Sequence, residues 1–399
     1  MRRTITAEEE LLLLLCGTAE RRRRMSDRIV ALAARADLEV LSALMARQML
    51  FPLLGTRLVE AAPAQVTPAM REQLDQALEL ARLRGLQLEL LALQLQNDLE
   101  RAGIPALPLK GTSLARNLYG DPGLRITQDI DILVGAEELN HAARVLERRG
   151  YRRGNGAYDS PGRLHLGLKH ERSELPPVEL HWRIHWYEDA FSRAMLERSA
   201  PAPEGRRARP ADELAALLLF FSRDGLMGLR LAADVATWWD ADERPKEDPL
   251  LDPICAEAPD LRDALSASAL SLERLVGVRA DAIVSARPAR WRSCTAVRMA
   301  NWTVSGDLDQ IGANLTLVDW LLAPPGGGWA FVRRVLIPPP AQISAMYGLA
   351  PSAVLRRTFW RLAHGPKLLV RYLIALWRVR RGRSWVPIPA SAWRPSAAR

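Results

Sequence analysis

The stretch Arg125–Val134 reads RITQDIDILV and decides the fold of this chain. Acidic and apolar residues alternate in it, which is typical of a half-buried β-strand and predicts a strand over 127–134. Residues two apart on a strand point to the same face, so Asp129 and Asp131 should converge while the isoleucines enter the core. Two neighbouring carboxylates repel each other unless a cation lies between them. Mg²⁺ is the expected cation, because it prefers hard oxygen ligands.

A glycine turn precedes this strand. The sequence predicts a short extended piece over 106–109 and a helix over 112–119, with Gly111 at the junction. Glycine lets the backbone approach a phosphate closely, and the first turn of a helix offers unpaired N–H donors to an anion. We therefore expect an anion cradle that faces the carboxylates. Its candidate side chains are Lys110, Thr112, Ser113 and Arg125.

The rest of the chain reads as helices around this centre. Apolar residues recur at helical spacing before residue 105 and again after residue 189, and two more extended pieces are expected over 164–168 and 178–182. The predicted fold class is α+β, with a small mixed sheet flanked by helical regions. Four regions are predicted: 1–103, N-terminal helical; 104–200, catalytic core; 201–350, C-terminal helical; 351–399, a basic amphipathic tail.

Several motifs together resemble one family. They are the Lys110-Gly111 turn, the segment Tyr119–Arg125, the Asp129-Ile130-Asp131 strand and the segment Val178–Trp182. In this order they resemble the uncharacterised nucleotidyltransferases of the DNA polymerase β superfamily. The resemblance implies a sheet-based nucleotidyltransferase core. It also implies a third carboxylate on a later strand, for which Glu179 is the candidate.

The resemblance further implies a reaction. An acceptor hydroxyl or phosphate would attack the α-phosphorus of a nucleoside triphosphate, ATP among them, and release pyrophosphate. Two Mg²⁺ ions, or Mn²⁺ in their place, would be held by Asp129, Asp131 and Glu179. His181 shares a strand face with Glu179 by alternation and joins the expected nucleotide-binding set. The acceptor is not identified by the sequence.

Composition limits the class of protein. An apolar content of 48% with 25% charged residues is typical of a folded globular protein. The three cysteines, Cys16, Cys255 and Cys294, form no CxxC pair, which argues against a disulfide framework or a thiolate zinc site. The apolar run Leu11–Leu15 is too short for a signal peptide. A cytoplasmic location is therefore expected.

The net charge of +9 lies at the C-terminal end. Residues 320–399 hold thirteen Lys and Arg and no acid, so residues 1–319 sum to −4. This placement disfavours nucleic acid as a partner, since no basic stripe lies on the catalytic part. The segment 356–383 is expected to form a basic amphipathic helix that is broken at Gly365-Pro366. It either lies on an anionic membrane at its inner face or packs its apolar stripe on the domain.

Other interpretations stay open. One is an inactive nucleotidyltransferase fold that serves as a scaffold with a docking tail, and another is an enzyme or toxin that modifies tRNA or other RNA. A zinc site at His181 and His185 is disfavoured, because that spacing suits a helix and this stretch begins as a strand. Asp212 is expected to cap a helix, and Asp234 to cap a helix or pair with an arginine.

Overall fold

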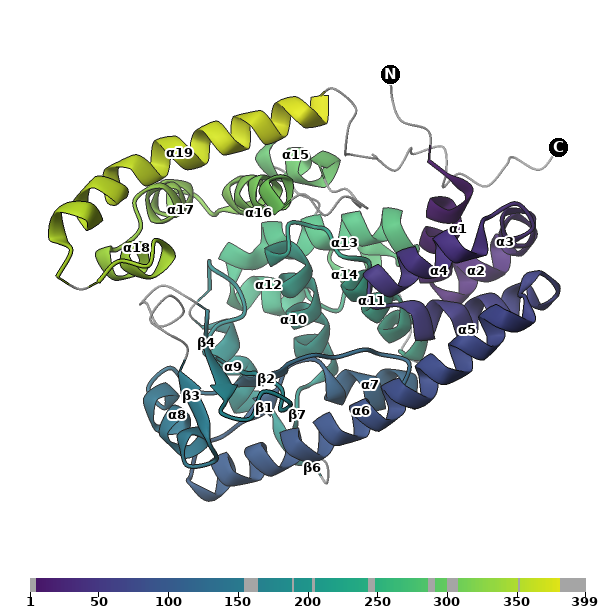
Figure 1. Cartoon of the computed structure of the whole chain (residues 1–399), viewed down its shortest axis with the longest axis horizontal. Helices are drawn as coiled ribbons and strands as arrows, with labels where there is room; N and C mark the ends of the chain where they lie inside the picture. Colours follow the sequence, from purple (N-terminus) through teal and green to yellow (C-terminus); the bar gives the residue numbers. More distant parts are fainter. Residues whose placement is uncertain are drawn as a thin grey trace.

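A computed structural model describes residues 5–153, 164–188, 190–202, 205–242, 248–285, 291–299, 308–350 and 352–380. A small mixed sheet lies at one side of a largely helical molecule, with the long helix α6 (Pro68–Arg101) running beneath it (Figure 1). The fold is therefore α+β, as the sequence predicts. The N-terminal helices are α1 (Ala7–Cys16), α2 (Ala19–Arg24), α3 (Ser26–Ala33), α4 (Leu38–Arg47), α5 (Phe51–Ala61), the short 3₁₀ helix η1 (Pro63–Gln65) and α6 (Pro68–Arg101).

Five strands in the order β1-β2-β5-β4-β3 form the main sheet. The central pair β2–β5 is parallel and the other pairs are antiparallel. A separate hairpin, β6 with β7, follows the sheet in the chain. The strands are β1 (Leu107–Pro108), β2 (Ile130–Leu133), β3 (Tyr151–Arg153), β4 (His165–His170), β5 (Val178–His181), β6 (Ala200–Ala202) and β7 (Gly205–Arg207).

One face of the sheet is apolar and packs on two helices. Ile130 and Ile132 point to this face and are buried against leucines of α6 and alanines of α8 (Leu139–Glu147). Leu88, Leu95 and Leu99 are the α6 residues of this cluster, which we call the second core. Burial of one face fixes the register, because a slip by one residue would move every side chain to the opposite face. The acidic residues are therefore held on the other face.

A larger cluster, the first core, joins the N-terminal helices to helices that follow the sheet. Leu11–Leu15 of α1 are fully buried in it together with most of α10 (Pro210–Arg223). Thr6 and Glu9 form a capping box that fixes where α1 begins. Helix α7 (Thr112–Tyr119) lies between β1 and β2 in the chain. The helices after the main sheet are α9 (Phe191–Arg198), α10 (Pro210–Arg223), α11 (Leu229–Ala241), α12 (Asp252–Glu257), the 3₁₀ helix η2 (Pro259–Leu261), α13 (Arg262–Val276) and α14 (Ala280–Ile283).

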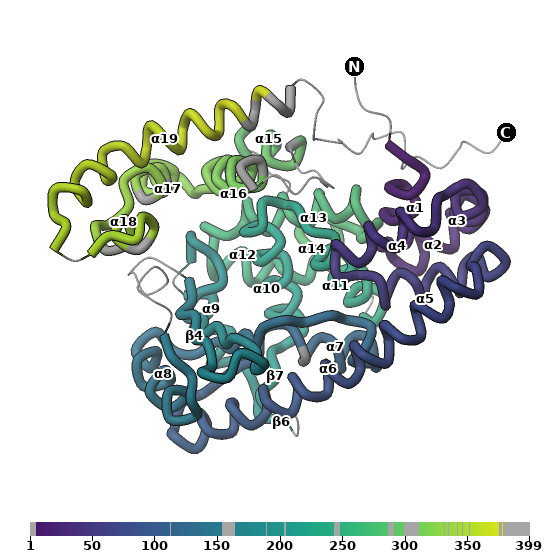
Figure 2. The backbone as a smooth tube through the Cα atoms, in the orientation of Figure 1, coloured from purple at the N-terminus to yellow at the C-terminus, as the bar shows by residue number. Residues whose placement is uncertain are grey.

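The last helices form a layer on the side opposite α6, as the tube in Figure 2 shows. The long α19 (Val354–Arg380) lies along its outer edge and packs on α16 (Leu308–Leu322), α17 (Gly327–Leu336) and α18 (Pro340–Met346). Helix α15 (Trp291–Met299) completes the layer. Tyr187 ties this layer to the segment after β5 by donating its hydroxyl hydrogen to the carbonyl oxygen of Asp319 at 2.8 Å. Among the described helices, none combines the length and apolar character needed to cross a bilayer.

Three local predictions differ from the structure. The strand predicted over 127–134 is shorter, because pairing with the neighbouring strand begins where the Ile130 amide donates to the Pro177 carbonyl. The predicted capping role of Asp212 is wrong, since the helix begins at Pro210 and Asp212 pairs with Arg198 at 2.6 Å. The predicted helix break at Gly365-Pro366 is also wrong, because α19 runs through both residues.

Candidate active site

The strands β2 and β5 bring two carboxylates side by side. Asp131 of β2 lies directly opposite Glu179 of β5 in their parallel register, so both point away from the second core. Asp129 lies one residue before β2, and its carboxylate reaches those of Asp131 and Glu179. Carboxylate oxygens of the three residues lie within 4.8 Å of one another. The structure thus brings together all three residues that the sequence predicts as metal ligands.

Asp131 is the most enclosed of the three. The residue is only 2% exposed, and its Oδ2 atom is buried with no hydrogen-bond partner among the described residues. An unpaired buried carboxylate oxygen is costly unless a cation satisfies it. Asp129 and Glu179 offer further hard oxygens at the same point, and Mg²⁺ prefers such ligands. The residues present therefore fit a divalent cation.

Lys110 supplies positive charge to this cluster. Its Nζ atom lies 3.4 Å from Asp131 Oδ1 and 4.7 Å from the centre of the Phe220 ring of α10. Burial alone would raise the pKa of Asp131, but Lys110 and a hydrogen bond with His181 outweigh burial and hold that pKa below its usual value. Asp131 is therefore kept ionised and ready to bind a cation.

The other two carboxylates differ from each other in their electrostatics. Burial raises the pKa of Asp129, and the negative charge of Asp131 raises it further. Burial also favours the protonated form of Glu179, but the hydrogen bond with His181 outweighs it and lowers the pKa of Glu179. The charge of Asp129 is thus the least compensated of the three, so a cation beside it would relieve the most repulsion.

The turn before α7 has the shape that glycine permits. Gly111 has φ +80° and ψ −122°, a backbone region that other residues rarely adopt, and it caps the N-terminus of α7. A Cβ atom placed there would lie 3.1 Å from Thr127 Cγ2. Thr127 in turn lies two residues before Asp129, so the turn packs directly on the chain that carries the carboxylates. The Thr112 side chain lies outside the described part of the structure.

A buried ion pair between Arg125 and Asp234 stabilises the Gly111 turn. The Arg125 guanidinium binds both carboxylate oxygens of Asp234 on α11, at 2.9 to 3.1 Å, and both side chains are almost fully buried. The same guanidinium donates to the Gly111 carbonyl at 3.3 Å and to Thr127 Oγ1 at 2.8 Å. Tyr119 adds a hydroxyl donor to Asp234 at 2.8 Å. The prediction that Asp234 pairs with an arginine is confirmed, and contact of Arg125 with a nucleotide stays a prediction.

Two histidines border the carboxylates. His181 Nε2 lies 2.9 Å from Asp131 Oδ1 and 3.3 Å from Glu179 Oε2. His165 on β4 lies opposite His181 in the antiparallel register, and its Nε2 is 3.6 Å from Glu179 Oε1. Burial and the neighbouring His181 lower the pKa of His165. His185 lies against Ser222 of α10, 3.3 Å from its hydroxyl. The histidine next to His181 is therefore His165 of the adjacent strand β4 and not His185.

Sequence reasoning missed His165, Phe220 and Arg223. Arg223, at the end of α10, stacks over the Phe220 ring at 4.7 Å, and its Nη1 is buried without a hydrogen-bond partner among the described residues. The Phe220 ring also contacts His181 edge-on, with 5.9 Å between ring centres. Phe220 and Arg223 lie far along the chain, at the end of an apolar helix, and His165 reaches the cluster through strand pairing, so no local motif marks them.

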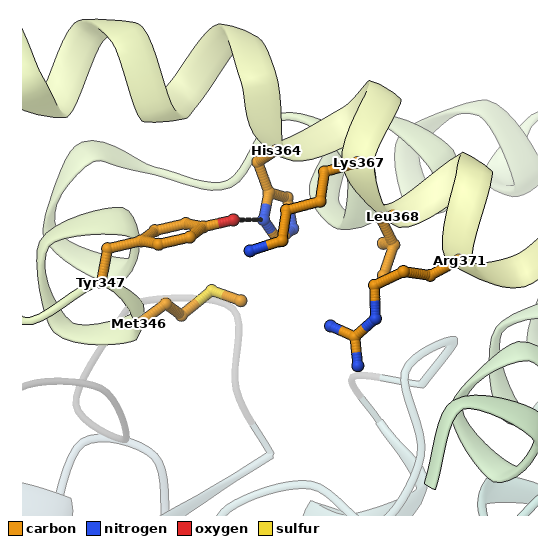
Figure 3. Close-up of a pocket in the computed structure, with 6 residues that line it drawn as sticks. All are labelled: Met346, Tyr347, His364, Lys367, Leu368 and Arg371. Atoms are coloured by element: carbon orange, nitrogen blue, oxygen red, sulfur yellow. Dashed lines mark hydrogen bonds between the residues drawn. The ribbon is translucent and has the colours of Figure 1, made fainter. Parts of the chain in front are cut away.

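The remaining predicted residue points elsewhere. Ser113, in the first turn of α7, lines a small cavity against α6 that also includes Gln96 and Arg116. Its hydroxyl accepts from the Asn117 amide at 3.3 Å. A second cavity, of about 190 Å³, lies between α18 and α19, on the inner side of α19 (Figure 3). It is lined by Met346, Tyr347, His364, Lys367, Leu368 and Arg371.

Comparison with known proteins agrees with this arrangement. A family model described as uncharacterised nucleotidyltransferase matches residues 34–277, so the chain belongs to this family of uncharacterised nucleotidyltransferases. No curated protein and no solved structure matches the chain. Family membership supports nucleotidyl transfer as the general activity and a nucleotide as a substrate.

Proposed function

We propose that the chain transfers a nucleoside monophosphate from a nucleoside triphosphate to an acceptor hydroxyl or phosphate, with two divalent ions held by Asp129, Asp131 and Glu179. One observation carries this proposal. The buried Asp131 leaves one carboxylate oxygen without a hydrogen-bond partner among the described residues, at the point where Asp129 and Glu179 add further oxygens. Family membership gives this cluster its chemical context.

In the proposed reaction an acceptor oxygen forms a bond to the α-phosphorus as the bond to pyrophosphate breaks. Bound ions would offset the negative charge of the triphosphate and of the attacking and leaving oxygens. Asp129 and Asp131 would hold both ions, and Glu179 would hold one of them and accept the proton of the attacking hydroxyl. Mg²⁺ fits the oxygen donors, with Mn²⁺ as the alternative.

Further groups would position the triphosphate. The Gly111 turn, which packs on the chain at Thr127 just before the carboxylates, and the N-terminus of α7 would offer N–H donors to a phosphate. Lys110 already neutralises Asp131 and can turn to a phosphate once a cation takes over that charge. We add Arg223 to the predicted set, because its buried Nη1 lacks a hydrogen-bond partner among the described residues. Contacts of Thr112, Ser113, Arg125 and His181 with the nucleotide stay predictions.

The test is calorimetric titration with ATP, GTP, CTP and UTP, with and without Mg²⁺. The variants are Asp129→Asn/Asp131→Asn and, as the matched control, Glu174→Gln, an exposed acid paired with Arg172 far from the cluster. We expect Mg²⁺-dependent binding of at least one nucleotide to wild type and to the control, and loss of binding in the double variant. The nucleotide that binds names the donor.

Two results would contradict the proposal. Nucleotide binding that survives in the double variant would show that Asp129 and Asp131 do not form the nucleotide site. Absence of binding in every protein would favour the scaffold alternative. Tight binding of RNA with steep salt dependence would instead favour the RNA-modifying alternative, because phosphate contacts release counterions.

A further inference from the structure

The histidines beside the carboxylates form a second group of ligands. His165, Glu179 and His181 come from the adjacent strands β4 and β5, and one ligand atom of each lies within 4.8 Å of the other two. The strand register, not a loop, sets their positions. Glu179 belongs both to this group and to the group of three carboxylates. A cation held by Glu179 can therefore be reached by nitrogen as well as oxygen.

The distances in this group agree with neighbouring ligands of one metal ion. Bonds of about 2.0–2.2 Å at right angles place adjacent ligand atoms about 3 Å apart. Here His181 Nε2 lies 3.3 Å from Glu179 Oε2 and 2.9 Å from Asp131 Oδ1, and His165 Nε2 lies 3.6 Å from Glu179 Oε1. The Oδ2 atom of Asp131, buried and without a hydrogen-bond partner among the described residues, is a second observation that points to a ligand here.

Space is also available at this position. Gly167 lies opposite Glu179 in the β4–β5 register, and a Cβ atom built on it would meet nothing within 4 Å. A substrate group or water can therefore approach the ion from the β4 side. Imidazole nitrogen binds transition metals better than it binds Mg²⁺, which keeps to oxygen.

We propose that one of the two cation positions is a mixed nitrogen and oxygen site, formed by His165, His181 and Glu179 with Asp131, that takes a divalent transition metal such as Mn²⁺ in preference to Mg²⁺. The proposal rests on the proposed function, since it assigns ligands within the same centre. It gives the two cation positions different chemistry. Asp129 and Asp131 serve both positions, and the other position has oxygen ligands alone.

Pulsed electron paramagnetic resonance of the Mn²⁺-loaded full chain tests this assignment, because a ligating imidazole modulates the electron spin echo through its ¹⁴N nucleus. We expect ¹⁴N modulation in wild type, its reduction in His165→Gln and its loss in His165→Gln/His181→Gln. His170→Gln is the matched control, since His170 also lies on β4 but bonds to the Arg149 carbonyl, 2.8 Å away. The control should keep the modulation.

Metal affinity provides a second readout. The dissociation constant for Mn²⁺ should rise by more than about 10-fold in His165→Gln, a loss typical of removing a partner at a metal site. His165 is partly exposed, so this variant should fold even where the double variant does not. Mn²⁺ that binds through the carboxylates without ¹⁴N modulation would overturn the nitrogen ligands and leave the proposed function standing. Absence of any carboxylate-dependent Mn²⁺ binding would overturn both.

A separate observation concerns the outer face of α19. Among the α19 side chains that the structure describes, eight apolar ones are more than half exposed: Val354, Leu355, Phe359, Leu362, Leu369, Val370, Leu373 and Trp377. Leu355, Phe359, Leu362, Leu369, Leu373 and Trp377 recur at three- and four-residue steps or multiples of them, so they line one stripe. The opposite side of α19 is where His364 is buried and the cavity of Figure 3 lies. The stripe therefore faces outward.

Charge identifies what would cover this stripe. Arg356 and Arg361 are exposed on α19, and residues 320–399 contain no acid. A second copy of the chain would place like charges together, which is unfavourable. An anionic lipid surface offers both an apolar interior and opposite charge, and a helix with this pattern lies flat in such an interface. The geometry points to an anionic membrane as the surface that covers this stripe. This assignment specifies the membrane contact predicted for 356–383, of which 381–383 lie outside the described residues.

Vesicle co-sedimentation of the full chain tests the membrane assignment. We expect the chain to pellet with vesicles of phosphatidylcholine mixed with phosphatidylglycerol, to stay unbound with phosphatidylcholine alone, and to be released by high salt. Leu369→Asp/Leu373→Asp should lose the binding. The matched control is Leu80→Asp/Leu83→Asp, which places the same charges on two exposed leucines of α6.

Vesicle binding that survives in Leu369→Asp/Leu373→Asp would overturn the assignment, as would its absence in wild type. Analytical ultracentrifugation of the same proteins tests whether a second copy of the chain covers the stripe instead. A wild-type dimer that the stripe variant converts to a monomer would show that a second copy covers the stripe, and would also overturn the assignment.

Discussion

Arg125 and Asp234 show how one buried pair can hold a turn beside the candidate site. The pair is fully enclosed, and Arg125 uses its remaining donors on Gly111 and Thr127. Removal of one partner leaves an uncompensated charge in the interior, which costs much more than loss of an exposed pair. The residues around the turn therefore depend on this pair more than on any surface contact.

Asp234→Ala should destabilise the protein by about 3–5 kcal/mol, because Arg125 would remain buried without its counter-charge. Urea-induced unfolding followed by circular dichroism measures the change. Glu174→Ala removes a partner from the exposed Arg172 pair and should leave the unfolding midpoint unchanged. Equal midpoints for the two variants would show that the buried pair has no special role.

Gly111 allows a comparison between two glycines with positive φ. Gly111→Ala should cost about 1–3 kcal/mol, because its backbone region is nearly closed to other residues and the new Cβ would press on Thr127. Gly120→Ala, in the left-handed region with nothing within 4 Å, should cost about 1–2 kcal/mol. Only the first should weaken nucleotide binding in the calorimetric titration. A similar loss of affinity in both would mean that α7 as a whole, and not its N-terminal turn, matters.

At the scale of elements, the sheet positions the candidate site through register. The parallel pairing of β2 with β5 places Asp131 opposite Glu179, and the antiparallel pairing of β4 with β5 places Gly167 opposite Glu179 and His165 opposite His181. The candidate ligands of β2, β4 and β5 are therefore positioned by backbone hydrogen bonds between the strands. A residue on β4 can block the site without touching the cores.

Gly167→Leu should leave the melting temperature near that of wild type, since the new side chain enters open space and glycine is a weak strand residue. The same side chain would cover Glu179, so Mg²⁺-dependent nucleotide binding should fall below detection in the titration. Lys169→Leu is the control, because Lys169 lies on the same strand face two residues further on and is exposed. Unchanged nucleotide affinity in Gly167→Leu would place the nucleotide away from β4.

The sequence could predict what local patterns determine. Alternation around Asp129 and Asp131 marks the strand and its acidic face, and the order of motifs points to Glu179. The sequence could not predict His165, because this residue reaches the cluster only through the pairing of β4 with β5. The break expected at Pro366 failed for a similar reason. Packing of α19 on three other helices outweighs the local cost of a proline within it.

At the scale of the whole molecule, the matched family region omits a helix that the structure needs. The match begins at residue 34, yet α1 lies before it and is buried in the first core together with α10 and α13. Residues of the predicted regions 1–103 and 201–350 share this core. The four predicted domain boundaries stay a prediction.

Leu13→Ala should lower the unfolding free energy by about 2–5 kcal/mol, since Leu13 is fully buried and its removal leaves a cavity. Circular dichroism and tryptophan fluorescence should report the same shifted midpoint, because α1 packs on α11 and α13 within the first core. Leu83→Ala, at an exposed leucine of α6, is the control and should leave the midpoint unchanged. Separate midpoints for the two probes in Leu13→Ala would show that α1 unfolds independently.

Helix α6 contributes to both cores, and this sets a limit on how the molecule can move. Met70 near its start lies in the first core, and Leu99 near its end lies in the second. The 34 residues of α6 span about 50 Å without a break. Because the helix is continuous, it holds the two cores at a fixed separation. We therefore expect nucleotide binding to involve side chains and loops and to leave the separation of the two cores unchanged. Fluorophores at the two ends of α6 should then report the same distance with and without nucleotide.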